Sequence, residues 1–275
     1  MKNFSNKYIF IYSAVLVAVV AVLLSVVAMS LKGRQDANVR NEKMQILLAA
    51  INVEADANQA AEMYQQYFDQ ELTVATDGSV LSVYNVKNGE MEQGSVRAFD
   101  VKLKDQQALE KAGQQGAFPV YVFSKDGRKG YVIPTQGNGL WGAVYSNIAL
   151  DEDFNTIIGV TFSHESETPG LGAEIAEQKF QQPFIGKQIL DENGQVISIA
   201  VKKNADPNGA HEVDAISGGT MTSNGVNAML AADLARYQKF IDATRAGLVT
   251  EGSDEFQVPV EEIAVEFEEG EEVSL

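Results

Sequence analysis

The sequence contains no cysteine and only two histidines among its 275 residues. The lack of cysteine excludes disulfides, iron–sulfur ligation, thiolate catalysis and lipid attachment at a cysteine. With two histidines and no H-E-x-x-H sequence, we expect no metal site. Neither G-x-x-x-x-G-K-[ST] nor G-x-S-x-G occurs, which argues against a phosphate-binding P-loop and a hydrolase nucleophile.

Basic residues are also few, because 21 Lys and Arg stand against 38 Asp and Glu, a formal net charge of −17. Residues 251–275 hold ten of the acidic residues and no basic one. Proteins that bind nucleic acids need a basic surface for the phosphate backbone, so we expect no nucleic-acid partner. Apolar residues make up 45% of the chain, which is enough to bury a core and predicts a folded domain.

The longest uncharged run, "YIFIYSAVLVAVVAVLLSVVAMSL", covers residues 8–31. As a helix it would be about 36 Å long, against about 30 Å for the hydrocarbon core of a bilayer. A cleaved signal peptide is the alternative, but its apolar region is typically about 7–15 residues long and ends at small residues. The run is longer and has no clear cleavage site, so we predict one uncleaved transmembrane helix.

The charges that flank this run leave its orientation open. The positive-inside rule counts Lys and Arg near the ends of the span. Two basic residues precede the span and four follow it: Lys2 and Lys7, then Lys32, Arg34, Arg40 and Lys43. This count does not favour an outside location for the C-terminal part.

Beyond the span, the pattern predicts a membrane-proximal helical segment at 32–70, one α+β domain at 71–250 and an acidic tail at 251–275. Period-two alternation predicts a mainly antiparallel sheet, including a hairpin at 118–135 that turns at Asp126-Gly127. Further strands are expected at 72–86, 95–103, 141–150, 154–166 and 195–203, and helices at 105–114, 173–186 and 226–245. The tail is expected to be solvated, with part of it able to dock through Val258, Val260, Ile263, Val265 and Phe267.

Residues 214–226, "DAISGGTMTSNGV", are the first candidate site. Gly218 and Gly219 permit a tight bend, and Thr222, Ser223 or Asn224 is expected to cap the helix that follows. A glycine loop before a helix N-terminus favours a phosphate or another anion. From spacing alone, an ordinary strand–loop–helix junction remains the alternative.

Two further stretches are candidates. In "HESETPGLGAEI", residues 164–175, Pro169, Gly170 and Gly172 predict a tight bend, and a plain polar turn is the alternative. In "PTQGNGLWG", residues 134–142, the only tryptophan lies on a glycine-flanked turn. Trp141 is either a packing residue or an aromatic wall for a planar ligand.

In this order, and behind one N-terminal span, the three motifs resemble the C subunit of the sodium-translocating NADH:quinone oxidoreductase (Nqr), whose FMN-binding domain is shared with the G subunit of the Rnf complex. The resemblance covers nearly the whole chain apart from the tail. It implies an electron-transfer protein in the bacterial inner membrane, with residues 1–7 in the cytoplasm and the domain on the periplasmic side. It implies the other subunits of the Nqr complex and a flavin transferase as partners.

The resemblance also implies site residues. The threonine of the SGAT-type motif, which carries FMN through a phosphoester bond, corresponds to Thr220. Asp214 and Ser217 belong to the motif that the transferase recognises, and Gly219 stands where the family usually has alanine. Glu167, Thr168, Leu171 and Trp141 are implied flavin neighbours. We expect no G-x-G-x-x-G fingerprint after a strand, so the chain is expected to lack its own NADH site.

Three other functions stay open at this stage. An Rnf G subunit would share the flavin domain. A membrane-anchored module that binds a phosphate-bearing ligand reversibly would explain the glycine loop. A purely structural assembly protein would need no flavin.

Overall fold

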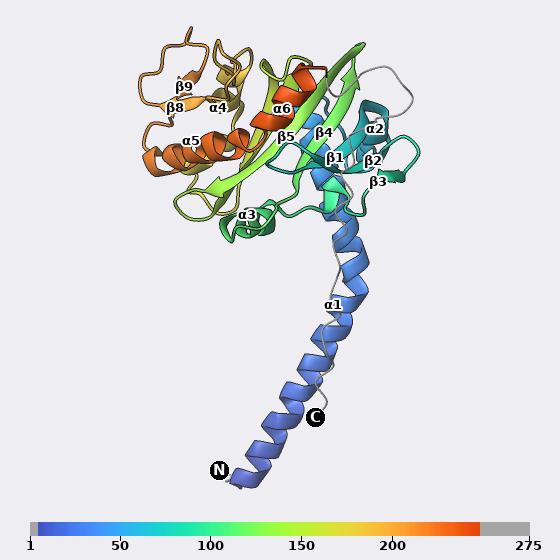
Figure 1. The fold of residues 1–275 in the computed structure, drawn as a ribbon. Helices are drawn as coiled ribbons and strands as arrows, with labels where there is room; N and C mark the ends of the chain where they lie inside the picture. The colour runs from blue at the N-terminus through green and yellow to red at the C-terminus, as the bar shows by residue number, and fades with distance from the viewer. Residues whose placement is uncertain (1–4, 248–275) are drawn as a thin grey trace.

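Helix α1 (Asn6–Ala50) carries the apolar run away from a compact domain, as Figure 1 shows in blue. The computed structural model describes residues 5–247. The predicted span is exposed on all sides, and α1 is long and apolar enough to cross a membrane. The same helix continues past the span, and only its last turns become buried, at Leu47, Leu48 and Ala50. The predicted span and the first part of the predicted membrane-proximal segment are therefore one continuous helix.

A seven-stranded antiparallel sheet forms the centre of the domain, with the strand order β3-β2-β1-β4-β5-β6-β7. Its hairpin between β4 and β5 turns at Asp126 and Gly127, which have φ of 53° and 75°, so the predicted turn is confirmed. The strands are β1 (Phe68–Val74), β2 (Val80–Asn85), β3 (Glu90–Gln93), β4 (Phe118–Lys125), β5 (Arg128–Asn138), β6 (Ala143–Asp151) and β7 (Ile157–His164). A separate parallel pair joins β8 (Ala200–Lys202) to β9 (Glu212–Asp214).

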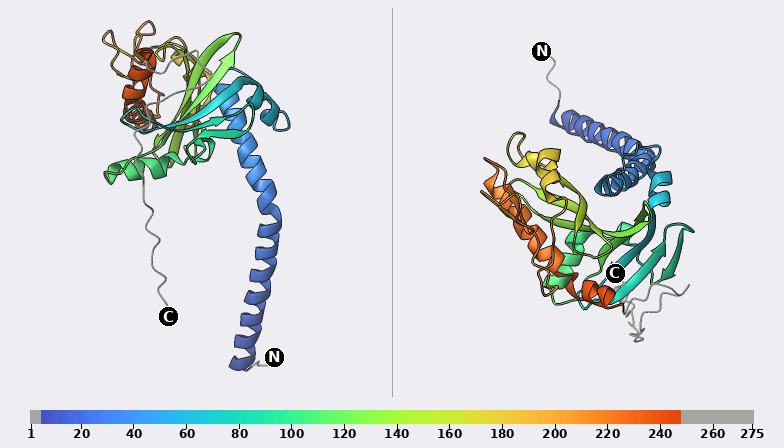
Figure 2. Two further views of the ribbon diagram at one scale, coloured as in Figure 1. Left: turned by 45° about the vertical axis from the view of Figure 1, so that its right-hand side comes forward. Right: turned by 90° about the horizontal axis from the view of Figure 1, so that it is seen from above.

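Both faces of the sheet are covered, because successive side chains of a strand point to opposite faces. Val120 belongs to the apolar cluster that packs against α5 (Thr220–Ala235) and α6 (Gln238–Arg245). Its neighbour Tyr121 belongs to a second cluster, with the end of α1 and with α2 (Ala60–Tyr67). Figure 2 shows α1 and α5 on opposite sides of the sheet. This arrangement confirms the predicted α+β fold.

Short helical pieces complete the domain: η1 (Ala98–Asp100), α3 (Leu103–Lys111), η2 (Gly172–Ala176), α4 (Gln178–Gln181) and η3 (Gln182–Phe184). The strand expected at 95–103 is wrong, because η1 and the start of α3 occupy this stretch. The buried carboxylate of Glu71 accepts hydrogen bonds from Arg97 Nε at 2.9 Å and from the Phe99 amide at 3.1 Å. These donors turn the chain around Glu71 instead of extending it along the sheet.

Three other expectations need correction. The helix expected at 173–186 is broken into η2, α4 and η3, and Pro183 lies at the start of the last piece. The strand expected at 195–203 is reduced to the three residues of β8. The helix expected at 226–245 is two helices, because the chain turns after Ala235 and buries Tyr237, whose hydroxyl donates to Pro119 O at 3.0 Å. The predicted docking residues of the tail lie outside the described residues.

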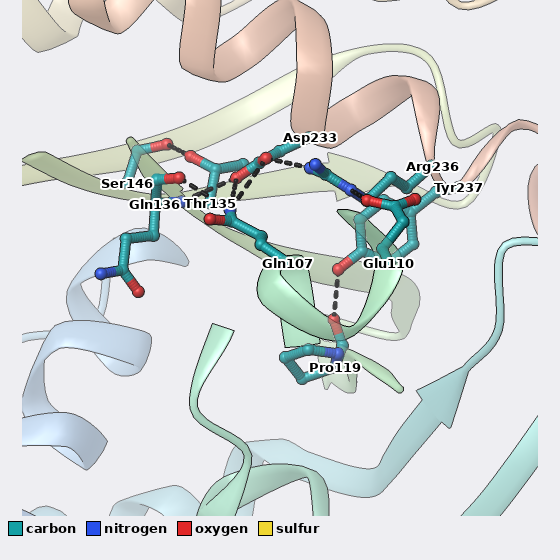
Figure 3. Close-up of polar contacts among 9 residues, drawn as sticks. All are labelled: Gln107, Glu110, Pro119, Thr135, Gln136, Ser146, Asp233, Arg236 and Tyr237. Carbon is teal, nitrogen blue, oxygen red and sulfur yellow. Dashed lines mark hydrogen bonds and ion pairs between the residues drawn. The ribbon is translucent and has the colours of Figure 1, made fainter. Parts of the chain in front are cut away.

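The C-terminal end of α5 is fastened to α3 and β5 by the polar cluster of Figure 3. Asp233 Oδ2 accepts a hydrogen bond from the Gln136 amide at 2.8 Å, and Asp233 Oδ1 accepts one from Gln107 Nε2 at 3.1 Å. Arg236 pairs with Asp233 and, at 2.6 Å, with Glu110. Burial raises the pKa of Asp233 above its ordinary value, more than these donors lower it. The cluster fixes the axis of α5 across the sheet.

Candidate functional site

The glycine loop delivers the chain from β9 to the start of α5. Gly218 has a φ of 80°, a conformation that side chains other than glycine rarely adopt. Gly219 is the N-cap residue, with a φ of −103° and no side-chain hydrogen bond to the first turn. Thr220 is the first helical residue, and its side chain is exposed. The expected capping by Thr222, Ser223 or Asn224 is therefore wrong, because all three lie inside the helix.

Thr222 and Ser223 turn inward and have other partners. Thr222 Oγ1 donates to Glu167 Oε2 at 2.6 Å, and Ser223 Oγ accepts from the Ile216 amide at 3.0 Å. Both side chains are buried. Their hydroxyls hold the loop and the 164–175 segment against the helix, so neither is presented at the surface where a ligand would bind.

The two predicted recognition residues lie on the approach to this bend. Asp214 ends β9, is exposed, and accepts a hydrogen bond from the Ala205 amide through Oδ1 at 2.9 Å. Ser217 is exposed on the loop next to Gly218. Both side chains are accessible from solvent. Their role in recognition stays a prediction.

Glu167 joins the three candidate segments. Its carboxylate accepts from the Trp141 amide through Oε1 at 2.8 Å and from Thr222 through Oε2, and the residue is only 5% exposed. Burial raises the pKa of Glu167. Hydrogen bonds from Thr222 and from backbone amides of the Trp141 turn lower the pKa by more than burial raises it, so the pKa lies below its ordinary value. The structure thus places Glu167 beneath the site rather than on its surface.

Glycines make room for this junction. A Cβ atom at Gly172 would overlap Glu167 Oε2 and Thr222 Oγ1, and one at Gly139 would overlap Glu167 Oε1. A Cβ atom at Gly225 of α5 would overlap the carbonyl oxygen of Asn138. The first turn of α5, the turn before β6 and the turn after β7 can approach closely only because these side chains are absent.

Exposed apolar side chains lie on the segments that meet near the first turn of α5. Trp141 is 67% exposed and Leu171 is 44% exposed. Leu171 lies against the loop, because a Cβ atom at Gly218 would be 2.9 Å from Leu171 Cδ2. Leu140 and Met221 are exposed as well. Large apolar residues left exposed to water on neighbouring segments are typical of a surface that receives a ligand or partner.

Thr168 closes the bend of the second segment through its backbone. Its carbonyl oxygen accepts from the amides of Leu171 and Ala173, both at 3.1 Å, while the residue itself is exposed. This bend presents Leu171 next to the loop that precedes Thr220. Thr168 therefore shapes the site through its backbone.

Sequence reasoning missed several contributors to this site. Gly139 and Gly225 act by lacking a side chain, and so does Gly172, which was predicted only as part of a bend. Leu140 and Met221 add to the exposed apolar surface. Placing an exposed leucine beside Trp141 was possible from the sequence. The overlaps at the glycines depend on contacts between distant segments.

Two alternative kinds of site find no support among residues 5–247. No group of three or more His, Cys, Asp or Glu in this range is placed to hold a metal ion. Residues 137–142, "GNGLWG", have G-x-G-x-x-G spacing, but they connect the antiparallel strands β5 and β6. A dinucleotide-binding fingerprint leads from a strand into a helix, so this stretch does not qualify.

The comparisons with known proteins concern the same residues. A family model described as an FMN-binding domain matches residues 139–235, which include all of the segments 164–175 and 214–226 and residues 139–142 of the segment 134–142. The C subunit of the Na⁺-translocating NADH-quinone reductase of Vibrio parahaemolyticus is 30% identical over 219 residues, covering 76% of this chain and 82% of the relative. The corresponding protein from Neisseria meningitidis is 38% identical over 136 residues, covering 49% and 52%.

Solved structures agree. The crystal structure of the C subunit from Parabacteroides distasonis has 35% identity and a TM-score of 0.66, covering 77% of this chain and 96% of that one. The structure of NqrC from Shewanella oneidensis has 25% identity and a TM-score of 0.60, with 75% and 98% covered. The fold and the site thus define an FMN-binding domain behind one long apolar helix. The chain belongs to the NqrC family, the C subunits of the Na⁺-translocating NADH-quinone reductase.

Proposed function

We propose that this protein is an electron-transfer flavoprotein of a sodium-translocating NADH:quinone oxidoreductase and that it carries FMN on Thr220 through a phosphoester bond. Family membership and the FMN-binding domain support the first part. In this proposal the other subunits of the complex are its partners, α1 is its single membrane span, and the domain lies on the periplasmic side of the inner membrane. The NADH site belongs to another subunit.

The observation that carries the attachment site is the position of Thr220. It is exposed at the first position of a 16-residue helix, after a loop whose N-cap residue supplies no side-chain acceptor. The first backbone N–H groups of a helix lack intrahelical acceptors and form its positive end. A phosphodiester on Thr220 Oγ1 would place its negative charge beside these donors. Thr222, the other threonine of this turn, is buried and engaged with Glu167.

The surroundings of Thr220 also fit the rest of FMN. Trp141, Leu171 and Met221 offer apolar surface for the flavin ring. Bound FMN supplies redox chemistry, since it accepts and releases electrons. A covalent link would retain the flavin without the help of binding affinity, so these side chains would serve to orient the ring and tune its potential.

A separate transferase is needed to form the bond. A threonine hydroxyl is a weak nucleophile near neutral pH, and among the described residues no histidine or lysine forms a hydrogen bond with Thr220 as a base. With FAD as donor, the new P–O bond forms at Thr220 Oγ1 and the pyrophosphate bond breaks. AMP leaves and the hydroxyl proton is released. The exposed loop around Gly218 gives such an enzyme access.

The test is co-expression of the full chain with the flavin transferase, followed by denaturing gel electrophoresis and intact-mass measurement. We expect a fluorescent band and the added mass of one esterified FMN. Thr220→Val should lose both, whereas Thr220→Ser keeps a hydroxyl and should retain some attachment. A dark wild-type band, or a fluorescent Thr220→Val band, would refute attachment at this residue.

A further inference from the structure

We propose that Glu167 is a positioning residue, which holds the turn of Trp141 at a fixed place relative to the first turn of α5. The proposal rests on the proposed function only where it concerns the flavin on Thr220. Its structural part concerns the protein without flavin and is tested separately below.

Each oxygen of the Glu167 carboxylate serves a different segment. Oε1 accepts from the Trp141 amide at 2.8 Å, and Oε2 accepts from Thr222 Oγ1 at 2.6 Å. Gly139 lies over Oε1 and Gly172 lies over Oε2, and a methyl group at either position would collide with the carboxylate. The space around Glu167 is therefore shaped for a carboxylate with these two partners.

The exposed ring of Trp141 depends on this junction for its place. Its amide donates to Glu167, and its carbonyl oxygen accepts from Ser166 Oγ at 2.9 Å. Both backbone groups of Trp141 are thus held by consecutive residues of one segment, while the side chain is 67% exposed. On the other side of the carboxylate, Thr222 lies two residues after Thr220. One carboxylate therefore connects the aromatic surface to the attachment residue.

The same carboxylate also carries charge. Within residues 5–247, no Lys or Arg forms an ion pair with Glu167, and the hydrogen-bond donors found for it are a hydroxyl and backbone amides. Its negative charge is therefore uncompensated beneath the surface where the flavin would lie. A nearby negative charge disfavours added electrons on a cofactor, because electrostatic interactions are strong in a partly buried site. We therefore expect Glu167 to lower the reduction potential of the attached flavin as well as to orient its surroundings.

The first experiment uses the flavin-free full chain in detergent micelles and needs no transferase. Trp141 is the only tryptophan, so intrinsic tryptophan fluorescence reports on this turn alone. We expect Glu167→Ala to lower the fluorescence anisotropy and to raise acrylamide quenching of Trp141. Thr222→Val should move both in the same direction, although its hydroxyl bonds to Glu167 and not to Trp141. Glu177→Gln, an exposed glutamate of the same region, is the matched control and should change neither.

If Glu167→Ala fails to fold, Glu167→Gln replaces it, because the amide keeps one acceptor and the shape of the side chain. The double variant Glu167→Gln/Thr222→Val should then show less than the sum of the two single changes in quenching. Unchanged Trp141 anisotropy and quenching in folded Glu167→Ala would overturn the positioning role, whatever the fate of the flavin. If that variant does not fold, the same result in folded Glu167→Gln/Thr222→Val would overturn it.

The second experiment uses protein loaded with flavin by the transferase. We expect the midpoint potential to rise in Glu167→Gln, which removes the charge. Thr222→Val keeps the charge and should shift the potential less. A potential that is the same in wild type and Glu167→Gln would overturn the electrostatic part. Failure to load any flavin would count against the proposed function, and the tryptophan measurement would still decide the positioning role.

Discussion

The two ends of helix α5 are fastened by buried carboxylates of different character. At the first turn, Glu167 accepts hydrogen bonds from Thr222 and from the Trp141 amide. At the last turn, Asp233 accepts hydrogen bonds from the Gln136 amide and Gln107 and pairs with Arg236 (Figure 3). Both ends meet the sheet or its loops. In the part of the chain that the structure describes, Asp233 alone of the two has a cationic partner.

This difference separates a structural junction from a candidate functional one. Asp233 and Arg236 neutralise each other far from the exposed threonine, and the result is a fixed helix end. Glu167 retains its charge beside the proposed flavin surface. Its pKa is lowered by hydrogen bonds, whereas burial raises the pKa of Asp233. The N-terminal end of α5 is therefore where a change in charge should affect function, and the C-terminal end is where it should affect stability.

The largest effect is expected from Asp233→Ala. Removing one partner of a buried ion pair typically costs about 3 kcal/mol or more. Here Arg236 would keep only its pair with Glu110. Arg236, the Gln136 amide and Gln107 would all lose an acceptor. We expect the free energy of unfolding of the domain to fall by about 3 kcal/mol in denaturant titrations followed by circular dichroism.

The control for this variant is Asp105→Ala, an exposed acid of α3, which should change stability by no more than about 0.5 kcal/mol. Among the Asp233→Ala molecules that fold, the proposed flavin attachment to Thr220 should proceed as in wild type. Loss of attachment in folded protein would contradict the division between the two ends.

A smaller effect is expected from Gly172→Ala at the other end. The added methyl group would collide with Glu167 and Thr222, and overpacking of this kind typically costs about 1–3 kcal/mol. The same substitution at Gly33 of α1, which has no neighbour within 4 Å, should be neutral or stabilising, because alanine favours a helix. Comparing the two variants in the same unfolding measurement separates the contact from the general effect of replacing glycine. Equal stability of both variants would mean that Glu167 and Thr222 can move aside for the added methyl group without lowering the free energy of unfolding.

Those parts of the fold that depend on local patterns could be predicted from the sequence. The Asp126-Gly127 turn, the alternation along the strands and the apolar run of α1 each follow from neighbouring residues. The strand expected at 95–103 failed because its alternation is overridden by Glu71, a buried acid more than 20 residues away. Such a partner leaves no signal in the local pattern.

The candidate site shows the same limit. The structure brings the three candidate segments together, since Glu167 contacts both Trp141 and Thr222. The different hydrogen-bond partners of the hydroxyl groups in this stretch could not be predicted from the sequence. Threonine is a common residue at a helix N-cap. The hydroxyl of Thr222 nevertheless donates to Glu167, 55 residues away in sequence. Local propensity identified the correct turn and assigned it the wrong interaction.

The smallest expected effect is in the pH dependence of stability, where the two ends should behave oppositely. The folded-state pKa of Glu167 lies below its ordinary value of 4.5, so its ionised form stabilises the fold above about pH 4.5. This contribution is lost as the pH falls through the lowered pKa. The folded-state pKa of Asp233 lies above its ordinary value of 3.8, so its contribution is fully present below pH 3.8 and is lost as the pH rises through the raised pKa.

Isosteric variants that cannot titrate in this range isolate each group. Relative to wild type, Glu167→Gln should become more stable as the pH falls below 4.5, because it has no such contribution to lose. Asp233→Asn should instead gain relative stability as the pH rises above 3.8. Denaturant titrations of the three proteins between about pH 3 and pH 7 measure both trends. If the two stability differences change in the same direction with pH, then hydrogen bonds do not favour the ionised form of Glu167 while burial disfavours that of Asp233. In that case Glu167 would not be the source of an uncompensated charge beneath the proposed flavin surface.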